Sequence, residues 1–429
     1  MKHIRPYKLK SGALQLTVFI GVIIALILAG LLLLGYTHRS LKNRSKLSVA
    51  VIRSCDDGIG YLCATSPVNS DTITLKQPEE GVIEKPVIKM HLSYWGIYPK
   101  AIVTSTQRNK KFTKAALLGS TAKGERVALF LQETYKPLAV AGSTQIRGKA
   151  ILPKMGIKPG YIAGNSFYGN ELLDGAIGVS SETFPVLQAD LQQQSTYYMK
   201  DYHPVTASEF ITLHEKRLQR NSFTAKPKGY SSERPVVLSD VKLQGNIVIR
   251  SAMSIRVERS AHLNDVILAA PVVELEDGVE GNFQVFASRS IICRKNCRLD
   301  YPSALVLTPK TQLQDEPFDR NRNKIIIEEN SMIKGVVAYT APNDDKGYLP
   351  NIFIDPNATV AGELYCKGNL ELRGTIYGTV YAKQLVVNEG GTVYLNHLYN
   401  AIIDVQKLPE QYVGLVFEDK IRDVLKWLY

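Results

Sequence analysis

The chain has 429 residues, 45% hydrophobic and 21% charged, which leaves room for an anchor and two or three domains. This ordinary globular usage excludes a wholly disordered or collagen-like chain. The formal net charge is +12, but the basic residues are scattered, with no run of five or more Lys or Arg. We therefore expect no nucleic-acid partner.

The first expected element is a membrane-spanning helix over 13–36. No charged residue occurs between Ser11 and Thr37, and 18–36 reads VFIGVIIALILAGLLLLGY. At about 1.5 Å per residue, this run can cross a hydrocarbon core of about 30 Å. The alternative is a cleaved secretory signal, but its apolar region is usually only about 7 to 15 residues and ends in small residues. Here Tyr36-Thr37-His38-Arg39 follows, so an uncleaved single-pass anchor is favoured.

The flanking charges do not decide the orientation of this helix. Four basic residues stand on each side, namely Lys2, Arg5, Lys8 and Lys10 before it and Arg39, Lys42, Arg44 and Lys46 after it. Long domains translocate largely regardless of such charges, and a β-rich body with close cysteines suits an oxidising space. We expect the short tail inside and the body on the extracytoplasmic side.

Small residues are spaced four apart along this segment, at Gly21, Ala25 and Ala29. A stripe of this kind lets another helix approach closely, so it predicts a helix-association face. The alternative is that glycine and alanine are simply common in membrane helices.

The residues before the apolar run read KSGALQLT over 10–17. They resemble the short basic leader of type IV pilin-like proteins, which a peptidase cuts after a glycine. The resemblance implies a cut between Gly12 and Ala13, a place in the bacterial inner membrane, and a role in a pilus- or secretion-like machine. The fifth residue after that cut is usually glutamate in the family and is Thr17 here.

The five cysteines form two close pairs and one single residue. Cys55 and Cys63 bracket a glycine-containing stretch that we interpret as a turn-rich loop, which a disulfide could close. Cys293 and Cys297 form a second pair that could be oxidised. The alternative for Cys293 and for Cys366 is a small buried hydrophobe in a strand. Neither pair has a CxxC spacing or a histidine cluster, so no metal site is expected.

The body is expected to be mostly β. Short apolar or alternating runs between 86 and 138 predict antiparallel strands, and frequent glycines over 139–187 predict irregular coils. No GxGxxG or GxxxxGK followed by Ser or Thr occurs there, which argues against a phosphate loop. The stretch 188–232 is polar and partly of helical period.

The second half contains repeats. Stretches that begin at Ile247, Val266, Val285 and Ala304 align at intervals of 19. A shorter form then follows, with a glycine, a branched residue and usually a tyrosine, at Gly335, Gly362, Gly378 and Gly391. Such units bury their apolar faces only by stacking, so they predict a β-solenoid. Its tyrosines Tyr365, Tyr381 and Tyr394 could form an external ladder that binds sugar, or stack for stability.

These later coils, over about 235–400, resemble bactofilin-type polymer-forming β-helices. The resemblance implies scaffolding by self-association, although bactofilins face the cytoplasm, which conflicts with the expected orientation. The end of the chain, QYVGLVFEDKIRDVLKWLY, has helical spacing and predicts a helix that covers the open end of the solenoid.

No recognisable catalytic, cofactor or metal motif occurs, and none of the seven histidines lies in one. Asp319-Arg-Asn-Arg-Asn323 imitates a calcium loop, but Lys324 and Asn330 occupy the glycine and glutamate positions. We therefore expect a non-enzymatic structural or assembly component, with the membrane and with itself or other envelope proteins as partners. The alternative is a surface protein that binds or cleaves polysaccharide.

The expected fold class is mainly β, with an N-terminal transmembrane helix. The expected division is a basic tail over 1–12, the membrane helix over 13–36, a stalk over 37–84, a β-rich domain with Gly-rich coils over 85–187, a polar and helical linker over 188–232, a β-solenoid over 233–400 and a C-terminal capping helix over 401–429.

Overall fold

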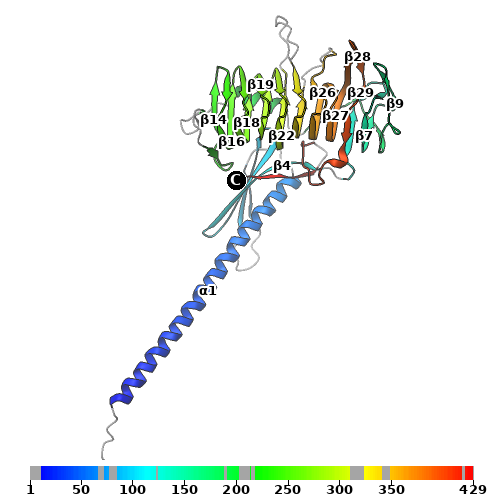
Figure 1. Ribbon diagram of the computed structural model, residues 1–429. Coiled ribbons are helices and arrows are strands. Elements are labelled where there is room, and N and C mark those ends of the chain that lie inside the picture. The colour runs from blue at the N-terminus through cyan, green and yellow to red at the C-terminus, as the bar shows by residue number, and fades with distance from the viewer. Residues whose placement is uncertain are drawn as a thin grey trace, which may run out of the picture. The chain divides into compact units, whose positions relative to one another are not determined.

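The computed structural model describes residues 11–65, 72–76, 85–121, 124–187, 191–201, 213, 218–309, 323–340, 348–417 and 421–428. These residues are mainly β, and one long helix precedes the strands, as expected (Figure 1). The chain divides into two compact units. The first holds 1–58, 73–89 and 103–113, and the second holds 59–72, 90–102 and 114–429.

The helix α1 (Ser11–Thr65) is continuous over its whole length. It is long and apolar enough to cross a membrane, with a mean hydropathy of 3.0 in its most apolar 18-residue window. Further along, Val51, Cys55, Ile59 and Leu62 are buried at spacings of three or four residues, which is one helical face. The expected loop-like stalk over 37–84 is therefore wrong up to Thr65, because a second apolar face extends the helix. Residues 66–71 and 77–84 of that stalk lie outside the described ranges.

An antiparallel sheet follows the helix. Its strand order is β1-β2-β3-β4-β31, and its strands are β1 (Ile73–Lys76), β2 (Val87–Trp95), β3 (Tyr98–Gln107), β4 (Lys110–Thr121) and β31 (Ile421–Leu428). β2, β3 and β4 each have residues in both units. Tight turns at Gly96 and Arg108, both at positive φ, join these three strands.

The C-terminal helix expected over 401–429 is wrong. β31 pairs with β4 from Ile421 opposite Thr121 to Leu428 opposite Ala115. Before it come β30 (Ile402–Asp404) and a single 3₁₀ turn (Val405–Lys407). The apolar spacing fits a helix, but β4 offers an open sheet edge, and pairing with it overrides the local period.

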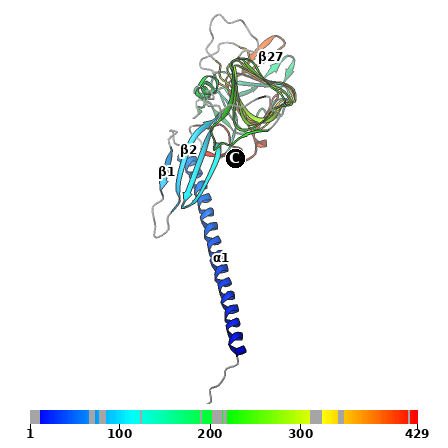
Figure 2. The ribbon, with the colours of Figure 1, turned by 90° about the vertical axis from the view of Figure 1, so that its left-hand side faces the viewer.

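Most of the second unit is a stack of parallel strands. One column pairs in sequence through β14 (Lys228–Ser232), β16 (Lys242–Ser251), β18 (His262–Ala269), β20 (Glu280–Ala287), β22 (Arg298–Leu307), β24 (Met332–Tyr339), β26 (Thr359–Leu372) and β27 (Thr375–Glu389). A second column pairs through β15 (Val236–Leu238), β17 (Ser254–Val257), β19 (Val272–Leu275), β21 (Ser290–Cys293), β23 (Lys324–Ile327) and β25 (Ile352–Ile354). Figure 2 looks along the direction in which the coils stack, and the strands follow one another around a common core. The parallel pairing is consistent with a solenoid.

The register confirms part of the expected repeat. Ile247 pairs with Val266, an interval of 19, but Val266 pairs with Phe283 and Val285 pairs with Leu305. The expected alignments of Val266 with Val285 and of Val285 with Ala304 are therefore wrong. Irregularities in the register lie within β16, β18, β20 and β22, and each shifts the following residues along the partner strand.

The glycine pattern has a structural cause. Gly335 pairs with Gly362 and Gly362 with Gly378, and all three have φ between +138° and +150°. A Cβ on Gly362 would collide with the carbonyl oxygen of Gly335, and a Cβ on Gly378 with that of Gly362. Gly391 does not continue the column. It forms the turn at which β28 (Thr392–Leu395) folds back antiparallel on β27.

The expected domain over 85–187 is not a separate domain. β5 (Val127–Leu131) pairs with β27, β8 (Lys149–Leu152) with β5, and β12 (Ile177–Val179) with β8, all in parallel. Residues from the first half of the chain thus extend the stack beyond β27, whose edge would otherwise be open. Smaller strands join in the same way: β7 (Gln145–Arg147) pairs with β30, and β6 (Leu138–Ala141) lies between β9 (Ile157–Pro159) and β29 (His397–Tyr399). β10 (Tyr161–Ile162) and β11 (Asn165–Ser166) form a small hairpin.

The linker expected over 188–232 is only partly helical. α2 (Leu191–Thr196) continues into a single π turn (Tyr197–Asp201). β13 (Gln219–Asn221) and β14 then belong to the stack, which therefore begins before residue 233. The helical period over 207–220 falls mostly outside the described residues.

Two large apolar clusters of described residues hold the second unit together. The inner cluster fills the stack with one layer per coil, for example Leu268, Val285, Leu305 and Val337. The outer cluster covers one external face of the same strands and includes Phe286, Tyr365 and Tyr381 together with Trp95 and Phe417. The expected external ladder is therefore wrong for Tyr365 and Tyr381, which are 0% and 6% exposed. A second layer of chain covers the face that carries them.

Candidate functional site

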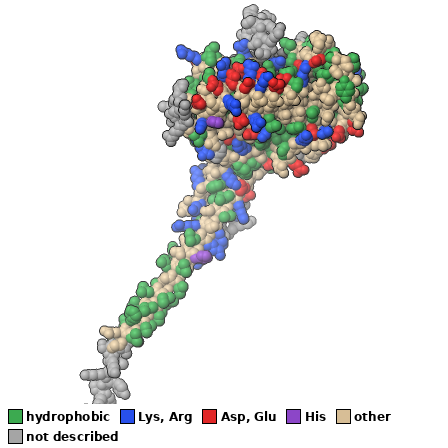
Figure 3. All heavy atoms as spheres, viewed as in Figure 1, with side chains coloured by type: hydrophobic (Ala, Val, Ile, Leu, Met, Phe, Trp, Pro, Cys, Tyr) green, Lys and Arg blue, Asp and Glu red, His purple; other side chains and the backbone are tan. Residues whose placement is uncertain are grey.

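The first candidate site is the apolar part of α1. Figure 3 shows hydrophobic side chains along this part of the helix, and they are exposed in the structure. A Cβ added at Gly12 or Gly21 would meet nothing within 4 Å among the described residues. Thr17 donates its hydroxyl to the carbonyl of Leu14 at 2.9 Å, so its polar group is satisfied within the helix. The leader bond Gly12–Ala13 and the face Gly21, Ala25 and Ala29 stay predictions.

The disulfide expected between Cys55 and Cys63 is wrong. Both cysteines are free and lie on α1, eight positions apart. That spacing along a helix separates them by about 12 Å, whereas a disulfide requires Cα atoms within about 7 Å. Cys55 is fully buried and its Sγ lies 3.5 Å from the Phe112 carbonyl oxygen and 3.7 Å from that of Val103. Burial raises the pKa of Cys63.

The other cysteines are buried in the stack. Cys293, Cys297 and Cys366 are free, and each is 0% exposed. Burial raises the pKa of Cys366 to about 12. The interpretation of Cys293 and Cys366 as buried residues of strands is confirmed, since they end β21 and lie within β26.

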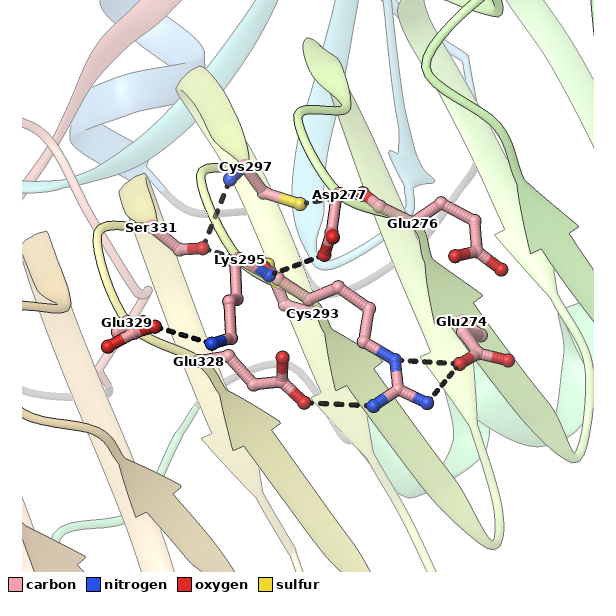
Figure 4. A network of polar contacts seen from close by, with 10 residues as sticks. Glu274, Glu276, Asp277, Cys293, Lys295, Cys297, Glu328, Glu329 and Ser331 are labelled. Carbon is pink, nitrogen blue, oxygen red and sulfur yellow. Dashed lines mark hydrogen bonds and ion pairs between the residues drawn. The ribbon is translucent and has the colours of Figure 1, made fainter.

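Cys293 and Cys297 flank one corner of the stack, and this corner carries the polar network of Figure 4. Cys297 donates its thiol to the carbonyl of Glu276 at 3.1 Å, and its N–H donates to the hydroxyl of Ser331 at 3.1 Å. That hydroxyl donates to the carbonyl of Arg294 at 2.7 Å. The interaction between the two neighbouring thiols raises the pKa of Cys293 and lowers that of Cys297.

Two basic residues join this corner to its neighbours. Arg294 lies 2.6 Å from Glu274 in the coil before and 3.0 Å from Glu328 in the coil after. These carboxylates raise the pKa of Arg294. The Lys295 ammonium group pairs with the Glu329 carboxylate at 2.5 Å. The backbone N–H of Lys295 donates to the Asp277 carboxylate at 3.1 Å. Partly exposed pairs are individually weak, so this network mainly fixes the geometry of the turn.

The second unit also contains a cleft of about 380 Å³. Its lining comes from distant parts of the chain: Ser120, Glu125–Val127, Phe130, Ile151, Pro185, Glu363, Thr379, Tyr381, Leu408, Tyr412 and Phe417. The buried Glu363 accepts a hydrogen bond from the N–H of Leu415 at 2.5 Å. Arg126 donates to the carbonyls of Pro409 and Glu410, each at 2.6 Å. Both charged groups therefore dock the segment 408–415 onto the stack.

No sequence motif indicated this cleft, because its lining residues meet only after the stack has formed. Tyr381 and Phe417, with ring centroids 5.0 Å apart, come from β27 and from the segment before β31. The glycine-branched-tyrosine pattern was the one available signal, and it marked Tyr381 without indicating its partner.

Among the described residues, no group of three or more His, Cys, Asp or Glu side chains could hold a metal ion. The calcium-loop imitation at 319–323 lies outside the described residues except for Asn323.

Comparisons with known proteins do not identify a family for this chain. No protein-family model matches the chain, and no curated protein matches it. The solved structures that match include the competence-associated pilin ComZ from Thermus thermophilus, with 9% sequence identity and a TM-score of 0.21. The alignment covers 89% of this chain and 97% of that one. A TM-score of this size does not establish a shared fold.

Proposed function

We propose that this chain is a non-enzymatic, membrane-anchored structural or assembly component of a bacterial envelope machine, pilin-like at its N-terminus. In this proposal the apolar part of α1 lies in the inner membrane, the body is extracytoplasmic, and the parallel stack is a β-solenoid that serves as scaffold and docking surface. Its partners are other copies of this chain or other envelope proteins.

The observation that carries the proposal is the course of the chain around the antiparallel sheet. Thr121 at the end of β4 pairs with Ile421 at the start of β31, so the whole stack is inserted between two neighbouring strands. The sheet therefore holds both ends of the chain segment that forms the stack. A stack attached to the sheet in this way supports a role in docking other proteins or in spacing them.

The continuous helix supports an anchored role. α1 carries both the apolar segment and the buried residues Val51 and Cys55. The Cys55 side chain contacts the backbones of β3 and β4, so no loop separates the apolar segment from the sheet. The leader-like residues 10–17 stand at the start of this helix.

The tyrosine ladder, one observation behind the polysaccharide alternative, loses two of its three rings. Tyr365 and Tyr381 pack against Phe417, with ring centroids 6.4 and 5.0 Å away, inside the outer cluster. Rings buried in this way present no stacking face to a sugar.

The test is the N-terminus of the mature protein. We would co-express the full-length chain with a prepilin peptidase, purify it in detergent, and determine its intact mass and N-terminal sequence. The proposal expects Ala13 as the first residue. Gly12→Leu should block the cut, whereas Gly21→Leu, a matched change beyond the cleavage site, should leave it intact. An N-terminus at Met1, or a cut near Thr37, would contradict the pilin-like assignment.

A further inference from the structure

The corner between Cys293 and Cys297 is one of a series. In neighbouring coils the residue that ends the short strand and the residue four positions later are both buried, as in Leu275 with Val279, Ile327 with Ser331 and Ile354 with Ala358. A turn hydrogen bond closes each corner, for example from the N–H of Val279 to the carbonyl of Glu276 at 3.3 Å. The two buried positions of a corner therefore flank the same tight turn.

The strand register places both cysteines in this series. Cys293 pairs with Leu275 in the coil before and with Ile327 in the coil after. Arg298 pairs with Glu280 and with Met332, so Cys297 stands between Val279 and Ser331. This coil holds two thiols where its neighbours hold an aliphatic pair or an aliphatic residue with serine.

The surrounding coils hold the turn in one geometry. Arg294 and Lys295 form ion pairs with Glu328 and Glu329 on the following coil. On the preceding coil Arg294 pairs with Glu274, while the Cys297 thiol donates to the Glu276 carbonyl at 3.1 Å. The turn is thus held from both sides, and both cysteine side chains are buried in the core next to it. Two buried thiols that flank one tight turn can be joined with little backbone movement.

We propose that Cys293 and Cys297 form a disulfide across this corner when the stack folds in an oxidising compartment. The oxidant is a protein or small molecule that carries a reactive disulfide. The presence of that oxidant rests on the extracytoplasmic location proposed above. The ability of the corner to form the bond is independent of that location.

The chemistry is thiol–disulfide exchange. The Cys297 thiol loses its proton, and its sulfur attacks the disulfide of the oxidant and displaces one oxidant thiolate. The Cys293 thiol then loses its proton and attacks Cys297 Sγ, which displaces the second oxidant thiolate. Two S–H bonds are replaced by one S–S bond, and the oxidant takes up both electrons and both protons as two thiols. Cys297 is assigned the first step because its interaction with the neighbouring thiol lowers its pKa and raises that of Cys293.

The decisive experiment uses purified full-length protein in detergent. The reduced protein is unfolded, refolded in detergent with oxidised glutathione present, denatured in acid, alkylated and digested with trypsin. Cleavage after Arg289, Arg294, Lys295 and Arg298 separates the two cysteines, so a disulfide leaves peptide 290–294 joined to peptide 296–298. The proposal expects this linked pair to dominate, with Cys366 fully alkylated as the internal control. Complete alkylation of Cys293 and Cys297 would overturn the proposal.

A second arm separates the corner from the location. Protein alkylated at the moment of cell lysis reports the state in the cell. Linked peptides there support both the disulfide and the extracytoplasmic body. Reduced cysteines in the cell together with linkage in glutathione support the corner and contradict the proposed location.

A variant guards against misfolding as an explanation. Cys293→Leu with Cys297→Val copies the pair Leu275 and Val279 of the coil before. It should fold, yield no linked peptide, and unfold at the same temperature with and without dithiothreitol. The oxidised native protein should unfold at a lower temperature once the reductant is added. A native unfolding temperature that is insensitive to reductant would count against a disulfide that constrains the corner.

Discussion

Gly362 is a tightly constrained position in the glycine column of β24, β26 and β27. Its φ is +150°, and a Cβ there would collide with the carbonyl oxygen of Gly335 and lie 2.8 Å from the hydroxyl of Tyr412. Strained backbone and overpacking each cost about 1–3 kcal/mol, so Gly362→Ala should lower the free energy of unfolding by about 2–4 kcal/mol. Urea denaturation of the full-length protein would measure the change.

The matched control for that substitution is Gly178→Ala. A Cβ at Gly178, in the terminal strand β12, would meet only the side chain of Ile151 at 3.7 Å and the carbonyl of Ala150 at 3.9 Å, which is ordinary contact. We expect a change within about 0.5 kcal/mol there. Equal effects of the two substitutions would mean that the glycine column is not a steric requirement.

His397 predicts a pH dependence. Burial lowers its pKa, Lys158 lowers it further, and the hydrogen bond from Nδ1 to the Leu395 carbonyl at 2.8 Å opposes both. A folded pKa below the unfolded value of about 6.5 means that the fold favours the neutral ring. This contribution is present above the unfolded pKa and is lost as pH falls through the folded pKa. Between pH 7 and pH 5 the unfolding temperature should therefore fall more for the native protein than for His397→Gln. Parallel pH profiles would exclude a role for His397.

At single positions the sequence indicated which side chains are buried better than it indicated which residues pack against them. Cys366 was interpreted as a buried hydrophobe, and it is. Tyr365 and Tyr381 were placed outside because alternation marks them as outward from the stack, which is correct for their strands. Alternation cannot tell that residues such as Phe417, from the far end of the chain, cover that outer face.

At the scale of elements, β31 is the strand whose loss has the clearest consequence. A chain that ends after Phe417 leaves residues 115–121 of β4 without their partner, and this apolar edge should promote association through strand pairing. The parallel column from β16 to β22 makes no use of β31 in its pairing and should persist. We expect light scattering to show aggregation, while limited proteolysis still yields a resistant fragment from that column.

The control keeps the strand and removes one exposed ring. Trp427 is 51% exposed and lies 4.9 Å from the Lys114 ammonium group. Trp427→Ala should lower the free energy of unfolding by only about 1 kcal/mol and leave the protein soluble. If the truncated chain is as soluble as this variant, β31 does not protect the edge of β4.

Elements that follow from the hydrophobic pattern of their own residues were predictable. Elements that depend on pairing with residues far away in the sequence were not. The interval of 19 between Ile247 and Val266 is visible in the sequence because coils of equal length repeat the same alternation. The later shift to Phe283 depends on irregularities in the strand pairing, which hydrophobic spacing does not reveal. The helical period of 413–425 likewise gave no sign that β4 would offer an edge to pair with.

On the scale of the whole molecule, two long-range pairings organise the second unit. β5 pairs with β27, and β31 pairs with β4, so the ends of the stack and of the sheet are completed by chain from far away in the sequence. Neither pairing leaves a local signal, which is why the division into successive domains was wrong. The β class and the helical anchor were predictable because composition and period suffice for both.

Self-association through α1 is the prediction that belongs to the assembled protein. Gly21 begins the stripe with Ala25 and Ala29, and Gly30 lies nine residues further, about 180° around the helix. If the stripe is the contact face, Gly21→Leu should raise the dissociation constant of full-length oligomers in detergent by about fivefold or more, because close helix approach is lost. Gly30→Leu, an equal change on the opposite face, should have little effect. Analytical ultracentrifugation would compare both variants with a fragment that begins at residue 37. Oligomers that survive in that fragment would assign the association to the stack and leave the stripe without this role.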